Sequence, residues 1–313
     1  MNKFLVSATP HIRKSNSITM QDAFIILALL PSVCCSIIYY NLAAFWILMV
    51  SSICCYLFDV CFSYIIIGKF DVRDISSVVT GMVLGLCMPV NISLWYVVLA
   101  SFFAVFIGKI LFGGQGRSLF NEPALGVALI SAVITGFSTS LCAYFNVEGV
   151  FLDSPLNVFV AGDYTAIPIF NLFMGNAGGL IGTTSAIAII IGGVFLMITN
   201  VYDFYIPIIS IVSFVVTIII TKGVTAFLPE LLAGSFLFVS FFLLPSHTSS
   251  PTIWISKCFY AIIFGVLAGL VRINYILGEA GVFFCLLLCN LITSVLDSLF
   301  SYFYRGRGLK KYE

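Results

Sequence analysis

The sequence predicts an all-α polytopic membrane protein, with about ten transmembrane helices arranged as two inverted five-helix repeats. Hydrophobic residues make up 61% of the 313 residues and charged residues only 9%, whereas an average soluble domain carries about 25% charged residues. The net charge of +1 gives no electrostatic signature for nucleic acid. Composition therefore excludes a soluble enzyme, a disordered chain and a nucleic-acid binder, and predicts a chain that lies in a lipid bilayer.

The apolar runs define the predicted helices, because a membrane-spanning helix needs about 20 mostly apolar residues. These runs lie at about 20–40, 43–67, 75–90, 94–112, 123–141, 180–198, 204–221, 231–245, 252–271 and 278–299. The third and eighth runs are the shortest, and they end at Pro89 and Pro245. Short segments interrupted by Gly or Pro are typical of broken helices around a site at membrane depth.

The distribution of Lys and Arg predicts the orientation, because cytoplasmic segments are enriched in these residues. With the N-terminus inside, the inner segments hold all of the cations except Lys222 and Arg272. These inner cations are Lys3, Arg13, Lys14, Lys69, Arg73, Lys109, Arg117, Lys257, Arg305, Arg307, Lys310 and Lys311. Both termini are therefore predicted to be cytoplasmic. The predicted segments are a cytoplasmic N-terminal segment 1–19, a first repeat 20–141, an external loop 142–179, a second repeat 180–299 and a basic cytoplasmic tail 300–313.

An internal match supports the two repeats, because the third to fifth spans resemble the eighth to tenth. At offsets of 153 to 159 residues, the matching pairs are Gly81 with Gly234, Pro89 with Pro245, Trp95 with Trp254, and Glu122 with Glu279. Five spans in each half would force the halves into opposite orientations, and sites in such proteins lie near the midplane between the halves. The alternative is two ordinary sets of packed helices.

The ten cysteines lie almost entirely within apolar runs and include no CxxC spacing. They are predicted to be small apolar packing residues. The sequence predicts no metal site and no conventional general acid–base pair.

Three stretches carry information beyond composition. They are DISSVVTGMVLGLCMP at 74–89, GKILFGGQGRSLFNEPALG at 108–126 and GGLIGTTSAIAIIIGG at 178–193, and they follow an opening SATPHIR at 7–13. In this order they resemble the RnfD/NqrB family, the flavin-carrying membrane subunits of the Rnf complex and of the sodium-translocating NADH:quinone reductase. The resemblance covers nearly the whole chain, and its length suits the RnfD branch.

This resemblance implies a subunit that passes electrons through flavins inside a six-subunit Rnf-type complex of the bacterial cytoplasmic (inner) membrane. Such a complex couples ferredoxin and NAD to sodium or proton movement. The implied partners are the other membrane subunits and an external subunit that bears FMN. Family members carry FMN through a phosphoester to a threonine in an external loop, and hold a riboflavin non-covalently in the membrane part.

The chain departs from the family pattern at several of the implied flavin positions. When the external loop is aligned on Pro168, the FMN acceptor position falls on Ile167, which has no hydroxyl group. Either Thr165 serves in a shifted motif, or the chain carries no covalent FMN. A family Gly-Glu-Thr-Ser reads GTTS at 182–185, a family Asp-Pro aligns with the SH at 246–247, and a family Asn-Pro-Ala reads NEPA at 121–124. These departures favour an alternative function, in which the chain is a flavin-free solute channel or a structural subunit. The family scaffold resembles that of ammonium and urea channels.

Two groups of residues are candidates for cofactor binding. Thr183, Thr184 and Ser185 open a predicted helix, where free N–H groups and the helix dipole favour a flavin phosphate; the alternative is a helix cap with close packing. A glycine-rich turn with Gly113, Gly114 and Asn121 enters the fifth span. It either lines the flavin region or forms a flexible interfacial turn.

Two carboxylates are candidates for an ion pathway. Asp59 lies within the second span, and an ionised carboxylate in the apolar layer usually faces a cavity, a partner or an ion. The alternative is a carboxylate near a helix end or a subunit interface. Glu279 begins the tenth span, where the positive end of the helix stabilises it, so that structural capping is its alternative role.

Overall fold

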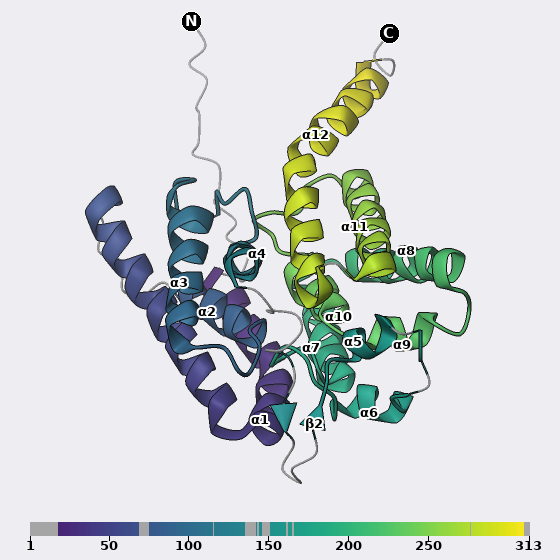
Figure 1. Ribbon diagram of the computed structural model, residues 1–313. Helices are drawn as coiled ribbons and strands as arrows, with labels where there is room; N and C mark the ends of the chain where they lie inside the picture. The colour runs from purple at the N-terminus through teal and green to yellow at the C-terminus, as the bar shows by residue number, and fades with distance from the viewer. Residues whose placement is uncertain are drawn as a thin grey trace, which may run out of the picture.

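The computed structural model describes residues 18–68, 75–114, 116–134, 142, 144–145, 151–160, 162–164, 166–275 and 277–309. Their regular structure is almost entirely helical, which confirms the all-α class (Figure 1). The α-helices are α1 (Ile18–Phe62), α2 (Ser76–Leu86), α3 (Leu94–Val105), α4 (Glu122–Val133), α5 (Pro155–Val160), α6 (Ile169–Met174), α7 (Ala186–Ile198), α8 (Tyr205–Lys222), α9 (Phe227–Leu232), α10 (Phe236–Phe238), α11 (Trp254–Asn274) and α12 (Gly281–Leu309).

Short irregular elements complete the described fold. Three π-helical turns, η1 (Ser63–Ile67), η2 (Phe106–Ile110) and η3 (Val239–Leu243), continue α1, α3 and α10. A 3₁₀ turn, η4 (Gly278–Ala280), leads into α12. Two-residue strands β1 (Tyr144–Phe145) and β2 (Phe151–Leu152) pair antiparallel.

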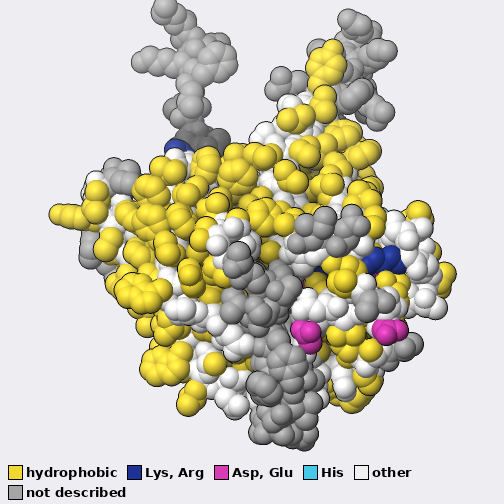
Figure 2. Space-filling view, viewed as in Figure 1, with side chains coloured by type: hydrophobic (Ala, Val, Ile, Leu, Met, Phe, Trp, Pro, Cys, Tyr) yellow, Lys and Arg dark blue, Asp and Glu magenta, His cyan; other side chains and the backbone are white. Residues whose placement is uncertain are grey.

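Several helices have the length and composition of membrane spans, which confirms a multi-pass membrane protein. Among the described residues, 4 segments qualify: Thr19–Ile65, Tyr205–Lys222, Trp254–Ile273 and Gly278–Tyr302. Shorter apolar helices lie at Ser76–Leu86, Leu94–Ile110, Glu122–Val133 and Ala186–Ile198. Hydrophobic side chains cover most of the face seen in Figure 2, as expected for a surface in contact with lipid rather than water.

The longest helical element consists of two helices. Asn41 inside α1 has φ 52° and ψ −139°, which is not helical. The sequence predicts a break between residues 40 and 43, and this prediction is confirmed. The carboxyl-terminal part of α1 then rises along one side of the molecule beside α3 (Figure 1), and α1 packs against α2, α3 and α7.

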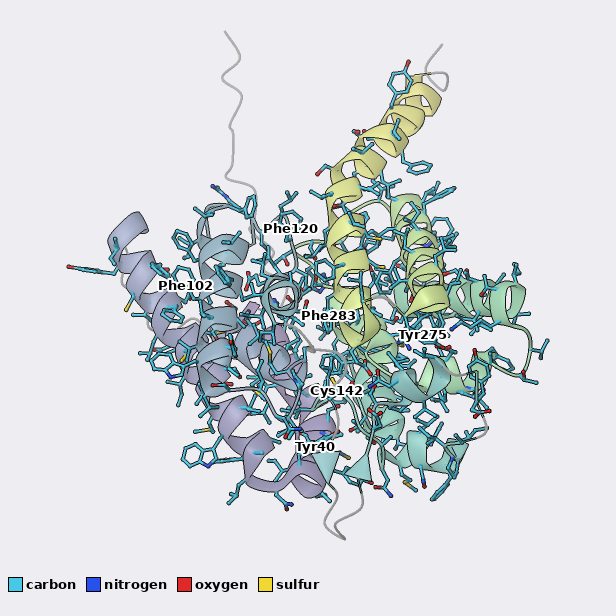
Figure 3. All side chains as sticks on the ribbon, in the orientation of Figure 1. Tyr40, Phe102, Phe120, Cys142, Tyr275 and Phe283 are labelled. Carbon is cyan, nitrogen blue, oxygen red and sulfur yellow. The ribbon has the colours of Figure 1, made fainter. Side chains whose placement is uncertain are left out.

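The first and second halves of the chain form two neighbouring groups of helices. Helices α1 to α4 lie on the left in Figure 1 and α8, α11 and α12 on the right, with α7 near the centre. The contact between α1 and α7 depends on a small residue, because a Cβ on Gly192 would lie 2.1 Å from the carbonyl oxygen of Ala28. Cys142 lies centrally between these groups in Figure 3.

Beyond the end of α2, hydrogen bonds between two backbone segments connect the two groups of helices. The N–H of Ile181 donates to the carbonyl oxygen of Met88 at 2.9 Å, and the N–H of Gly182 donates to that of Leu86 at 2.7 Å. Non-helical backbone needs such partners when it is buried, because a buried N–H or C=O without one is costly. The pairing explains how the short helix α2 can end at Leu86, inside the protein.

Candidate functional site

A cavity of about 320 Å³, here called the Asn121 cavity, opens beside the first turn of α4. It is lined by Gln21, Asp22, Ile25, Ser76, Val79, Thr80, Val83, Gly116, Asn121, Glu122, Pro123, Tyr202, Phe242, Leu243, Ser246, His247 and Thr248. The lining comes from α1, α2, α4, η3 and the segments around them, so both halves of the chain contribute to it.

Asn121 holds together the two sides of this cavity. Its Oδ1 accepts from the N–H of Ala124 at 3.3 Å and thereby caps α4. Its Nδ2 donates to the carbonyl oxygen of Leu243 at 3.0 Å and to Ser246 Oγ at 3.2 Å. Asn121 therefore connects the first turn of α4 to the end of η3.

The polar wall of the cavity is acidic. Asp22 and Glu122 line it, and Thr80 Oγ1 donates to Glu122 Oε2 at 2.8 Å. The His247 ring lies edge-on to Tyr202, 5.6 Å between centroids, and burial raises the pKa of Tyr202. No Lys or Arg occurs among the described residues that line the cavity. This wall suits a neutral or cationic group and disfavours a phosphate.

A second cavity of about 300 Å³, here called the Ile167 cavity, lies in the segment between β2 and α7. Its lining consists of Asp153, Val158, Ala166, Ile167, Pro168, Asn171, Asn176 and Ala177. Ile167, the aligned position of the FMN acceptor, therefore faces a cavity but offers no hydroxyl group. Thr165, the alternative acceptor, lies outside the described residues.

The other predicted cofactor residues lie outside the lining of both cavities. Thr183, Thr184 and Ser185 are buried; Ser185 Oγ accepts from the N–H of Ala188 at 3.4 Å and caps α7. Their observed contacts are those of a helix cap with close packing. Gly113 and Gly114, with φ of 102° and 95°, turn the chain after η2. Among the predicted cofactor residues that the structure describes, Asn121 is thus the one that lines either of these two cavities.

Asp59 forms a buried ion pair with a residue from another helix. Its Oδ2 lies 2.9 Å from Lys109 Nζ in η2, and Asp59 and Lys109 are only 4% and 2% exposed. Ser77 of α2 donates to the same oxygen at 2.5 Å. Sequence reasoning counted Lys109 among the inner-segment cations, although its position inside an apolar run could have indicated a buried cation.

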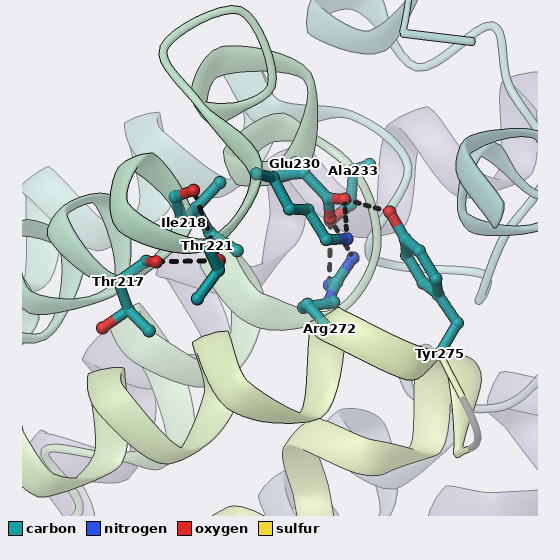
Figure 4. Close-up of polar contacts among 8 residues, drawn as sticks. Thr217, Ile218, Thr221, Glu230, Ala233, Arg272 and Tyr275 are labelled. Carbon is teal, nitrogen blue, oxygen red and sulfur yellow. Dashed lines mark hydrogen bonds and ion pairs between the residues drawn. The ribbon is translucent and has the colours of Figure 1, made fainter. Parts of the chain in front are cut away.

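A cluster of charged side chains, here called the Glu230 cluster, ties α8, α9 and α11 together. Lys222 Nζ lies 2.7 Å from Glu230 Oε1, and Arg272 Nη1 lies 3.5 Å from Glu230 Oε2. The hydroxyl of Tyr275 donates to Glu230 Oε1, and Figure 4 shows the Glu230 carboxylate in contact with both Tyr275 and Arg272. Lys222 also lies over the Tyr275 ring, 3.8 Å from its centroid. The sequence pattern gives no indication of these partners, because they come from separate helices.

Glu279 is the neighbour of this cluster and is fully buried. Its Oε1 accepts from Ser154 Oγ at 3.0 Å, and its backbone carbonyl accepts from Ser235 Oγ at 2.8 Å. Figure 3 shows Tyr275, four residues before Glu279, at the lower end of α11. Glu279 therefore connects the start of α12 to the segment before α5 and to α10.

The fit around Glu279 depends on Gly234, which has φ +72°. A Cβ here would lie 2.7 Å from both Arg272 Nη2 and Glu279 Oε2. We expect Gly234→Ala to lower the free energy of unfolding by about 1–3 kcal/mol more than Gly162→Ala does. Gly162 is the matched control, because its φ is +84° and nothing lies within 4 Å of its Cβ position. Chemical denaturation of the purified variants measures the difference, and equal losses would contradict the crowding at Gly234.

The fold and these sites define a polytopic membrane protein whose described residues form the Asn121 and Ile167 cavities and buried ion pairs between helices. Residues 5–303 match the NQR2, RnfD, RnfE family, and the chain belongs to this family. The RnfD/NqrB resemblance of the sequence motifs is thereby confirmed.

Named relatives come from both branches of the family. The chain is 28% identical over 295 residues to the D subunit of the Na⁺-translocating ferredoxin:NAD⁺ oxidoreductase complex of Acetobacterium woodii, covering 93% of this chain and 92% of the relative. It is 24% identical over 312 residues to the D subunit of the proton-translocating ferredoxin:NAD⁺ oxidoreductase complex of Clostridium ljungdahlii, covering 95% and 94%. It is 26% identical over 235 residues to the B subunit of the Na⁺-translocating NADH-quinone reductase of Chromohalobacter salexigens, covering 71% and 57%.

Proposed function

We propose that this chain is the membrane electron-transfer subunit of an Rnf-type ion-translocating oxidoreductase, which passes electrons through flavin across the bilayer and couples them to Na⁺ or H⁺ transport. The observation that carries the proposal is near-complete coverage, because the match to two such D subunits extends over more than nine-tenths of each chain. The proposed partners are the other membrane subunits of the complex and an FMN-bearing external subunit. The proposed location is the bacterial inner membrane with both termini cytoplasmic.

The arrangement proposed for the membrane part is ten spans in two inverted five-helix repeats, 20–141 and 180–299, separated by an external loop. Matching contacts support it. Glu122 lies in the first turn of α4 and accepts from Thr80, the residue before Gly81. Glu279 lies just before α12, and its backbone carbonyl accepts from Ser235, the residue after Gly234. In each half, a hydroxyl next to the matched glycine donates to the matched glutamate, which supports the proposed repeat.

The Asn121 cavity is the proposed site of riboflavin. Its volume of about 320 Å³ lies within the range of about 300–1,000 Å³ typical of ligand sites. Thr80, Asn121 and Ser246 offer hydrogen-bonding groups, and the acidic wall suits a flavin without a phosphate. When bound, a flavin supplies the redox chemistry, and the protein positions its ring and tunes it.

Covalent FMN does not fit the residue at the aligned acceptor position, because Ile167 has no oxygen for a phosphoester. No step of the proposed function therefore depends on FMN at Ile167. Thr165 stays the alternative acceptor of a shifted motif. The same departure favours the second candidate function, a flavin-free solute channel or a structural subunit.

Flavin analysis tests the proposal. We expect the purified protein to be yellow, to release riboflavin on denaturation, and to show no FMN-phosphate adduct on the peptide that contains Ile167. The measurements are absorbance, chromatography of the released flavin and peptide mass spectrometry. A colourless protein that leaks solute after reconstitution would instead support the channel, and an adduct on Thr165 would demonstrate the shifted motif.

Asp59 and Glu279 are the proposed ion-pathway residues, because both are carboxylates buried among apolar helices. Lys109, the partner of Asp59, lies within η2, and π-helical turns occur frequently at functional sites. Unchanged cation transport by an Asp59→Asn variant of the assembled complex would exclude Asp59 from the pathway.

A further inference from the structure

Two fully buried carboxylates, Glu230 and Glu279, lie near one guanidinium group but have unequal surroundings. Glu230 has three partners: Lys222 at 2.7 Å, Arg272 at 3.5 Å and the Tyr275 hydroxyl. The Glu279 carboxylate accepts one side-chain hydrogen bond, from Ser154 Oγ to Oε1. Its Oε2 has no hydrogen-bond partner among the described residues.

Arg272 is oriented toward Glu230 rather than toward Glu279. Its Nη1 faces Glu230 Oε2, its Nη2 donates to the carbonyl oxygen of Ala233 at 3.1 Å, and its Nε has no hydrogen-bond partner among the described residues. Nη2 and Glu279 Oε2 nevertheless lie close to each other, because both are 2.7 Å from the Cβ position of Gly234. Arg272 thus compensates a charge on Glu279 without a direct hydrogen bond to it.

The surroundings of Glu279 do not match a metal-cation site. Hard cations such as Ca²⁺ and Mg²⁺ take about six or more oxygen ligands, whereas the one hydroxyl that contacts this carboxylate belongs to Ser154, among the described residues. The nearby guanidinium also repels a second cation. A proton requires no coordination shell, and a buried carboxylate with few partners is well suited to hold one.

We propose that Glu279 is a proton-carrying group of the ion pathway, with Arg272, which forms an ion pair with Glu230, as the nearby compensating charge. On loading, the carboxylate forms an O–H bond at Oε2 and becomes a neutral carboxylic acid; on release, that bond breaks and the proton leaves along the pathway. The assignment rests on the proposed ion-translocating function and deepens it by naming the ion at this residue.

The other titratable and charged groups around Glu279 are consistent with this role. Arg272 comes from α11, and Glu230 lies beyond it on α9. Cys142, which precedes β1, also interacts with Glu279, and burial raises the pKa of its thiol well above the ordinary value. The thiol therefore stays neutral, and Glu279 is the group that exchanges the proton.

Infrared difference spectroscopy of the purified full-length chain tests the proposal. We expect a protonated-carboxyl band that changes with pH, disappears in Glu279→Gln and shifts in frequency in Glu279→Asp. Asp297→Asn is the matched control, because it removes a carboxylate that lies outside the cluster and both cavities, where it accepts from Thr252, and it should leave this band in place. Adding NaCl at constant pH should not change the band.

Three results would overturn the proposal: no pH-dependent carboxyl band in the wild type, the same band in Glu279→Gln, or loss of the band on adding NaCl at constant pH. Glu279→Asp retains a carboxyl group, so the test stays decisive even if Glu279→Gln does not fold. Flavin content is measured on the same preparations. A flavin-free protein that shows the Glu279 band would refute the redox function while supporting the proton assignment.

Discussion

Replacing Lys109 with Met is expected to lower the free energy of unfolding by about 3–5 kcal/mol, because the substitution leaves Asp59 as an uncompensated buried charge. Asp59 would then keep only the hydrogen bond from Ser77 among its described side-chain partners. Its Oδ1 already has no hydrogen-bond partner within the described residues. Chemical denaturation in a single detergent measures the loss.

A double-mutant cycle separates the ion pair from simple loss of packing. We expect Asp59→Asn with Lys109→Met to be more stable than Lys109→Met alone, because the double variant buries no unpaired charge. Lys257→Met is the control for removing a less buried paired lysine, since the Lys257 side chain is 19% exposed and that of Lys109 only 3%. Losses that simply add would contradict coupling between Asp59 and Lys109.

Filling the Asn121 cavity is expected to reduce the flavin content of the purified protein at least about tenfold, which corresponds to a binding loss of about 1.4 kcal/mol or more. Val79→Trp places an indole on the α2 wall of the cavity, where the proposed riboflavin would bind. The expected result is a protein that remains folded but releases little riboflavin on denaturation.

Val78→Trp is the matched control, because Val78 lies on the same helix with similar partial exposure but outside the cavity lining. It should retain wild-type flavin content. Circular dichroism and size-exclusion chromatography establish that both variants are folded. Wild-type flavin content in a folded Val79→Trp variant would exclude the Asn121 cavity as the flavin site.

The chain combines a family scaffold with cavity residues of its own. The departures at Glu122 and at Ser246-His247, which are far apart in sequence, line the same Asn121 cavity. Ile167 lies in the wall of the other cavity. Glu122, Ser246, His247 and Ile167 thus lie where a ligand would bind, whereas Thr183 of the GTTS stretch lies outside both cavities, and flavin content is the most informative property to measure.

The amino-acid sequence was sufficient to predict the membrane class and the longer apolar helices, whereas α5 and α6 lie in the segment predicted as an external loop. These properties follow from local composition, because apolar runs partition into lipid and their backbone must then form helices. The non-helical Asn41 and the short helix α2 show that interruptions in the apolar runs also predicted where helices break or end. Asp59 and Glu279 also stood out, since a carboxylate in an apolar run is unusual at any position.

The pairing of buried groups, by contrast, became visible only in three dimensions. Lys109 is 50 residues from Asp59, Arg272 is 42 residues from Glu230, and Asn121 reaches Leu243 across 122 residues. The local pattern of apolar and polar residues does not predict such pairings, because they depend on how separate helices pack. The same reason explains why Thr183, Thr184 and Ser185 were predicted beside a flavin phosphate yet lie outside both cavities. Apolar sequence determines that a helix enters the membrane, whereas packing determines which buried charge lies beside which.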